Sequence, residues 1–107
     1  MLDLDKSIQI VRELSLTASL HPRHNILVDL RKTTLSDGSM EILMKIVMEF
    51  VQCMPSFTKK IASLIPNDQR RISFAEMFES CMKVQNFQYS FFTNYEDAIE
   101  WLSDIQN

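Results

Sequence analysis

The sequence predicts an α/β protein with a three-stranded parallel sheet of sequential βα units and four helices packed mainly on one face. Three observations predict this class. Apolar residues recur at helical spacing in four stretches and at strand spacing in three shorter ones, and the two kinds alternate along the chain. Strands joined by crossover helices run parallel, with right-handed connections. Asp29, Ser63 and Ser90 interrupt the strands at alternate positions, so we expect one sheet face to be at best partly covered.

The first part of the chain predicts a helix, a strand and a turn. Apolar residues at helical spacing predict a helix over residues 4–20, which ends near Pro22 because the residue before a proline disfavours the helical conformation. A short run rich in β-branched residues predicts a strand over residues 26–30. Residues 33–39 are rich in turn formers and connect this strand to the next helix.

The next stretch, residues 39–54, predicts the longest clean helix, and Pro55 ends it. Three neighbouring apolar stripes run along it: Ile42, Ile46 and Phe50, then Leu43, Val47 and Val51, then Met40, Met44 and Met48. Together they exceed what one sheet face can cover. We therefore expect this helix to contact a second surface, either a neighbouring helix or a partner.

The remaining elements follow the same alternation. Residues 59–65 and 87–92 predict strands, and residues 68–85 predict a helix that the capping box Ser73–Glu76 could restart. A second capping box, Thr93–Glu96, predicts the start of the last helix. This helix is expected to face the core with four apolar residues: Ala98, Ile99, Leu102 and Ile105.

Length and composition exclude several classes of protein. A chain of 107 residues is the size of one domain, so residues 1–107 are expected to share a single core. A net charge of −3 argues against nucleic acid as a partner, and a single glycine excludes the glycine-rich phosphate loops. No apolar run reaches the roughly 18 residues of a membrane span, and charges interrupt the first twenty residues where a signal peptide needs an apolar core. We therefore expect a cytoplasmic protein without a cofactor.

Candidates for catalysis or metal binding are weak. His21 and His24 straddle Pro22 and are expected to lie on a loop, and Cys53 and Cys81 lack the spacing of a zinc site and are expected in the core. Asp29 needs solvent or a cation, which Arg31 or Lys60 could supply. The sequence therefore favours a protein that is not an enzyme, with no catalytic and no metal-binding residue.

Three segments resemble, in order and spacing, the STAS-like proteins related to bacterial anti-sigma factor antagonists, which have a STAS or Sec14-like fold. They are Ile26–Arg31, Phe74–Phe78 and Tyr95–Leu102, and the resemblance covers roughly residues 4 to 104. It implies sequentially adjacent parallel strands with helices mainly on one side. The chain departs from the family pattern in starting at the first helix, without a β-hairpin before it, and in carrying Glu76 where members tend to have arginine.

The resemblance also implies a regulatory loop. In phosphoregulated relatives, an Asp-Ser-Ser-Gly loop follows the first of these segments, and Asp37, Gly38, Ser39 and Met40 fall on its four positions. Ser39 then matches the serine that a partner kinase phosphorylates. A phosphate there would meet the free N–H groups and positive dipole end of a helix. The alternative is that Ser39 serves only as an N-cap.

Two functions follow as hypotheses. The favoured one is a regulatory module of STAS type that binds a protein partner through the loop and helix start around Ser36–Met40. Its rival is a small-ligand carrier that holds an apolar or nucleotide-like molecule between the sheet and the helices, with the methionines Met40, Met44 and Met48 as adaptable lining. Packing of these methionines against the first helix is the simpler interpretation.

A homodimer is also predicted. Without a hairpin, the strand that contains Val28 has an unpaired edge, and the helix over residues 39–54 has surplus apolar surface. A second copy could cover the edge strand, the open sheet face or the methionine stripe. The alternative is that the first helix covers both surfaces within one chain.

Overall fold

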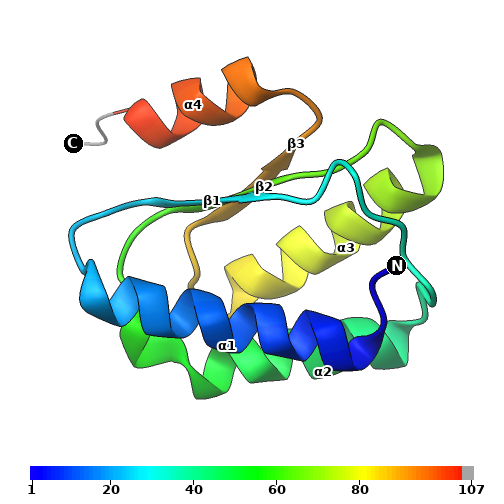
Figure 1. The fold of residues 1–107 in the computed structure, drawn as a ribbon, viewed down its shortest axis with the longest axis horizontal. Helices are drawn as coiled ribbons and strands as arrows, with labels where there is room; N and C mark the ends of the chain where they lie inside the picture. Colours follow the sequence, from blue (N-terminus) through cyan, green and yellow to red (C-terminus); the bar gives the residue numbers. More distant parts are fainter. Residues whose placement is uncertain (105–107) are drawn as a thin grey trace.

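A computed structural model of the chain describes residues 1–104 (Figure 1). The prediction of an α/β fold with a three-stranded parallel sheet and four helices is confirmed. The elements are α1 (Leu4–Leu20), β1 (Ile26–Asp29), α2 (Met40–Gln52), a short 3₁₀ helix (Met54–Ser56), β2 (Ile61–Leu64), α3 (Gln69–Val84), β3 (Tyr89–Phe92) and α4 (Tyr95–Ser103).

The sheet has the strand order β1-β2-β3, and both pairs are parallel, with Ile26 opposite Ile61 and Ile61 opposite Tyr89. Each strand has four residues, fewer than the apolar runs predict. Residues 30, 59–60, 65 and 87–88 belong to the connections before and after the strands. Side chains alternate between the two faces, as the period-2 pattern requires.

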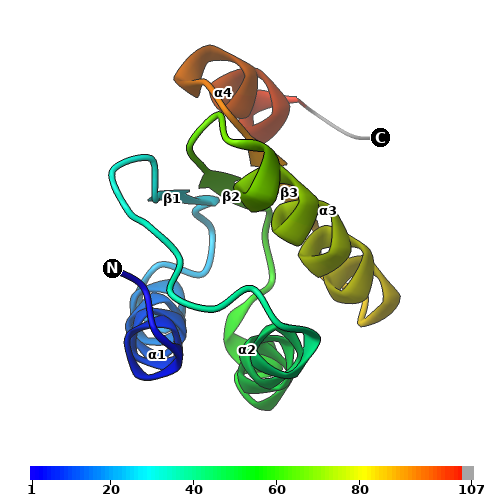
Figure 2. The same ribbon diagram turned by 90° about the vertical axis from the view of Figure 1, so that its right-hand side faces the viewer.

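The helices lie on both sides of the sheet in unequal numbers (Figure 2). Three helices, α1, α2 and α3, lie on one side, and α4 lies on the other. The larger core forms between the sheet and the three helices, around Val47, Phe50 and Met82. A smaller core forms under α4, around Ala62, Leu64 and Ala98. The face that the sequence leaves partly open is therefore occupied by α4 and is not a free dimer surface.

Two details of the helix starts differ from the prediction. Asp68 caps α3, which runs unbroken through Ser73 and Glu76, so the predicted restart there is wrong. The N-cap of α4 is Asn94, one residue after the predicted Thr93, because its side chain accepts a hydrogen bond from the amide of Asp97 at 2.9 Å. In return, the side-chain NH₂ group of Asn94 donates a hydrogen bond to the carboxylate of Asp97.

The inner face of α4 is partly confirmed. Ala98 is buried and Leu102 packs against the smaller core, as predicted. Ile99 is only half-buried and does not belong to this core, and Ile105 lies outside the described residues. Among the helices of residues 1–104, none has the length and apolar character to cross a membrane.

Candidate functional site

The loop and helix starts at one end of the sheet form the first candidate site. The chain leaves β1 and β2 at their carboxyl ends, and the N-termini of α2 and α3 lie at this same end, where open α/β sheets commonly bind ligands. An open groove runs between them. Asp37, Gly38, Ser39 and Met40 line one side, and Arg70, Arg71 and Met77 of α3 line the other.

Local hydrogen bonds order the loop before α2. The Asp37 carboxylate accepts a hydrogen bond from the amide of Ser39 at 2.9 Å, and the Ser39 hydroxyl accepts one from the amide of Ile42 at 3.3 Å. Ser39 is thus an exposed N-cap, the position that the sequence predicts for it. Both the capping role and the phosphorylation hypothesis are compatible with this exposure.

Gly38 is exposed and is not held in a left-handed conformation. A Cβ atom on it would lie 3.7 Å from the side chains of Leu35 and Phe74, an ordinary van der Waals distance. The only glycine of the chain is therefore required here neither by backbone strain nor by close packing.

The predicted methionine stripe lies on the outer face of α2. Met40, Met44 and Met48 are 47%, 39% and 47% exposed. Met44 and Met48 line an outer groove together with Leu4 and Ile8 of α1, so the packing against the first helix that the sequence suggests is only partial. The helix instead buries its other stripes, through Leu43, Ile46, Val47 and Phe50, against the sheet and its neighbours α1 and α3. The expected second contact surface of α2 is therefore formed by two helices.

A fourth methionine extends this stripe onto α3. Met77 is 48% exposed and lines the same groove as Met40, and the Met44 sulfur lies 3.9 Å from the thiol of Cys81. We call Met40, Met44, Met48 and Met77 the methionine surface. Exposed apolar patches of this kind commonly mark interaction sites, and flexible thioethers adapt to the shape of a partner.

The loop is also tied to the N-terminal segment. The amide of Leu2 donates to the carbonyl of Thr34 at 2.6 Å, and the amide and hydroxyl of Ser36 both donate to the carbonyl of Leu2 at 2.9 Å. These bonds form an isolated parallel bridge between Leu2 and Leu35. The start of the chain therefore supports the loop that precedes Ser39.

No family model, curated protein or solved structure matches this chain. The resemblance to STAS-like proteins therefore remains a prediction from the three segments quoted above.

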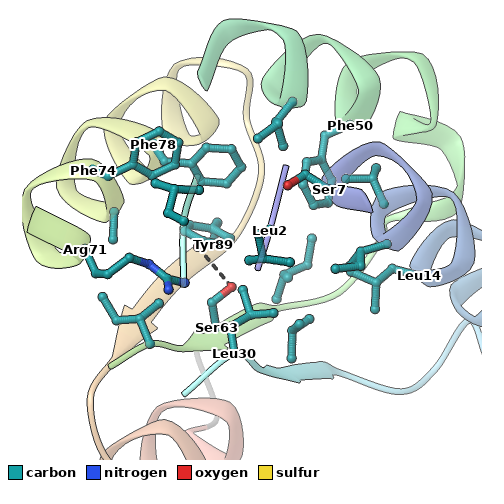
Figure 3. Close-up of a pocket in the computed structure, with 18 residues that line it drawn as sticks. Leu2, Ser7, Leu14, Leu30, Phe50, Ser63, Arg71, Phe74, Phe78 and Tyr89 are labelled. Atoms are coloured by element: carbon teal, nitrogen blue, oxygen red, sulfur yellow. Dashed lines mark hydrogen bonds between the residues drawn. The ribbon is translucent and has the colours of Figure 1, made fainter. Parts of the chain in front are cut away.

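A second candidate site is a cavity of about 100 Å³ between the sheet and helices α1, α2 and α3 (Figure 3). Its walls are mostly apolar, with Leu14, Val28, Phe50 and Phe78 among them. An apolar cavity of about 150 Å³ is large enough for one benzene molecule, so this one has no room for a nucleotide. The cavity lies between the sheet and the helices, where the carrier hypothesis expects a ligand, but Met40, Met44 and Met48 do not line it, so that part of the hypothesis is wrong.

Three groups of polar side chains reach this cavity. The Tyr89 hydroxyl donates to the Ser63 hydroxyl at 3.0 Å, and burial raises the pKa of Tyr89 to about 12. The guanidinium of Arg71 donates to the carbonyl and hydroxyl of Thr33 at 2.8 to 3.3 Å. Ser7 lines the wall formed by α1.

Sequence reasoning did not identify Ser7, Arg71 or the Ser63–Tyr89 pair as site residues. The sequence contains one sign of these residues, a polar side chain on an otherwise apolar helix face. Ser7 lies four residues before Val11 and Arg71 four residues before Ala75, so each shares a helix face with an apolar residue. Such residues are commonly solvated, so only the packing of three helices around them reveals the cavity.

The other polar candidates have structural roles. Asp29 pairs with Arg31 at 2.8 Å on the surface, where the hydrogen bonds from Arg31 lower the pKa of Asp29 to about 2. Lys60 does not pair with Asp29: it is buried, and its ammonium donates to the carbonyls of Trp101 and Asp104, both at 2.8 Å.

The cysteines and histidines also have ordinary surroundings. Cys53 and Cys81 are free thiols that are only partly buried, at the edge of the larger core. His21 and His24 are exposed on the loop before β1, with ring centroids 5.3 Å apart. No group of three metal-ligating side chains occurs within residues 1–104.

Proposed function

We propose that this chain is a cytoplasmic, non-enzymatic interaction module of STAS type that binds a protein partner. The contact includes the loop and helix start at Ser36–Met40 and continues over the methionine surface. Phosphorylation of Ser39 is the regulatory step of this proposal.

One observation carries the proposal: four large apolar side chains stand 39% to 48% exposed on two adjacent helices, next to an exposed serine. Burying such side chains against a partner is favourable by about 25 cal/mol per Å² of apolar surface. The surface needs no rearrangement of the core, because α2 already buries Leu43 and Val47 on its opposite side.

A pair of charge substitutions tests the contact. Met44→Lys places a charge at the centre of the methionine surface, and Leu16→Lys places the same charge on α1, where Leu16 is 64% exposed. Proteins captured from a cell extract are purified, and their affinities for the wild-type chain and both variants are measured by titration calorimetry. We expect Met44→Lys to weaken binding about tenfold or more and Leu16→Lys to leave it within about twofold.

Equal weakening by both substitutions would place the contact elsewhere on the chain. The absence of any partner whose binding depends on Met44 would overturn the proposal.

A further inference from the structure

We propose that the cavity between the sheet and helices α1, α2 and α3 binds a small apolar carboxylate, of about the size of isobutyrate, with Arg71 holding the carboxylate. This proposal does not depend on the function proposed above, since the cavity lies beneath the helices and the methionine surface lies outside them.

The size and walls of the cavity define the apolar part of the ligand. A volume of about 100 Å³ is smaller than the 150 Å³ cavity that takes up benzene, so it corresponds to a short branched chain and not to a ring. Apolar side chains from three helices and the sheet line it, including Ile10, Val28 and Phe78. Water in such a space finds few hydrogen-bond partners, whereas an apolar group loses nothing by entering it.

Arg71 defines the charged part of the ligand. The residue is 9% exposed, yet no carboxylate of the described residues lies within ion-pair distance of it. All of its side-chain hydrogen bonds end on one neutral residue, Thr33. A guanidinium has five N–H donors and usually pairs with an anion when it is buried, so this one keeps donors for a carboxylate.

Ser7 is a second unengaged group on the wall. Thr17, Ser19 and Ser80 donate their hydroxyls to the helix carbonyl four residues earlier. The Ser7 hydroxyl makes no such bond, although the residue is 9% exposed, and Figure 3 shows it across the cavity from Arg71. Within residues 1–104 every fully buried polar side-chain atom has a partner, so the Ser7 oxygen keeps some accessible surface, and Ser7 is among the residues that line the cavity.

A ligand has a short path to this position. Leu35, Arg71 and Phe74 line both the cavity and the open groove at the helix starts, so single side chains separate the two spaces. Leu2 also lines the cavity, and its bridge to Leu35 closes this wall. The carboxylate can therefore stay near the groove while the apolar group fills the interior.

Binding of two matched probes to the wild-type chain tests the proposal without any substitution. Isobutyrate and isobutanol have the same branched apolar part and differ in charge. We expect isobutyrate to shift the amide resonances of residues 7, 71 and 89 in a titration followed by NMR, and to bind about tenfold tighter than isobutanol. Equal affinity would overturn the role of Arg71, and no shift with either probe would overturn the site.

Two variants locate the binding. Arg71→Gln removes the charge inside the cavity, and Arg70→Gln removes the neighbouring charge, which is exposed and lines only the outer groove. We expect Arg71→Gln to weaken isobutyrate binding about tenfold and Arg70→Gln to change it less than twofold. Equal effects of both variants would show surface attraction only and would overturn the assignment.

A cavity-filling variant completes the test. Ala75 is 5% exposed and lines the cavity from α3, so Ala75→Leu fills it with an apolar side chain. We expect loss of binding of both probes with a retained folded NMR spectrum. Unchanged isobutyrate binding by folded Ala75→Leu would place the ligand outside the cavity.

Discussion

The loop before α2 does not need a glycine at position 38. Gly38 has room for a Cβ atom and an ordinary backbone conformation. We therefore expect Gly38→Ala to raise the free energy of unfolding by about 0.4 to 1 kcal/mol, because alanine restricts the unfolded chain more than glycine does. Urea denaturation checks this, and a loss of more than about 1 kcal/mol would mean that the loop needs glycine after all.

Ser39 combines a capping role with the proposed regulation. Loss of the side-chain bond to the Ile42 amide should make Ser39→Ala less stable by about 1 kcal/mol. Ser39→Asp keeps a good N-cap and adds negative charge at a helix N-terminus, so we expect it to retain stability and change the affinity for the partner. Unchanged affinity in both variants, measured by calorimetry, would leave Ser39 with the capping role alone.

Tyr89 makes stability depend on alkaline pH. Its pKa is raised to about 12 from an ordinary value of 10, so the unfolded chain loses the phenolic proton first. Stability from this group is complete below pH 10 and decreases by about 3 kcal/mol as the pH rises toward 12. We expect Tyr89→Phe to remove this part of the decrease in urea denaturation at pH 9 to 12, and an identical pH dependence in both chains would contradict the assignment.

At the level of secondary structure, α4 depends on a residue from a distant segment. Lys60 lies directly before β2, and its ammonium donates to two carbonyls at the end of α4 and lies 5.1 Å from the centre of the Trp101 ring. A positive charge at the C-terminal end of a helix also interacts favourably with the helix dipole. One buried lysine therefore joins the last helix to the sheet.

Substitution of adjacent lysines tests this contact. We expect Lys60→Met to lower the free energy of unfolding by about 1 to 3 kcal/mol, because two buried carbonyls lose a charged donor. Lys59→Met, at an exposed position, should stay within about 0.5 kcal/mol of the wild type. Trp101 fluorescence during urea denaturation measures both, and equal effects would contradict the capping role of Lys60.

For the assembled protein, the open question is self-association. The edge of β1 pairs with no strand of the described residues, and the methionine surface is exposed, while α4 occupies the opposite sheet face. A homodimer would therefore use either the edge of β1 or the methionine surface. The Asp29–Arg31 ion pair at the end of β1 disfavours edge pairing, so the methionine surface is the better dimer contact. A second copy would then compete with the proposed protein partner for this surface.

Sedimentation equilibrium tests the dimer. We expect a species of about twice the 12.5 kDa chain mass at high concentration, and Met44→Lys should return it to the monomer without unfolding it. Leu16→Lys serves as the control and should leave the dimer intact. A 12.5 kDa species at every concentration would contradict the dimer and leave the methionine surface to a different protein.

The sequence alone was sufficient for the class of fold, the order of its elements and the N-cap at Ser39, since each depends on local periodicity or on the chemistry of a few neighbouring residues. The tertiary structure decided the features that depend on how the helices pack against one another and against the sheet. Packing of α2 between α1 and α3 left Met40, Met44 and Met48 outside, although their spacing also fits a buried stripe. Packing of three helices on one sheet face brought Ser7, Arg71 and Tyr89 around one cavity, which no local pattern of residues so far apart in the chain can encode.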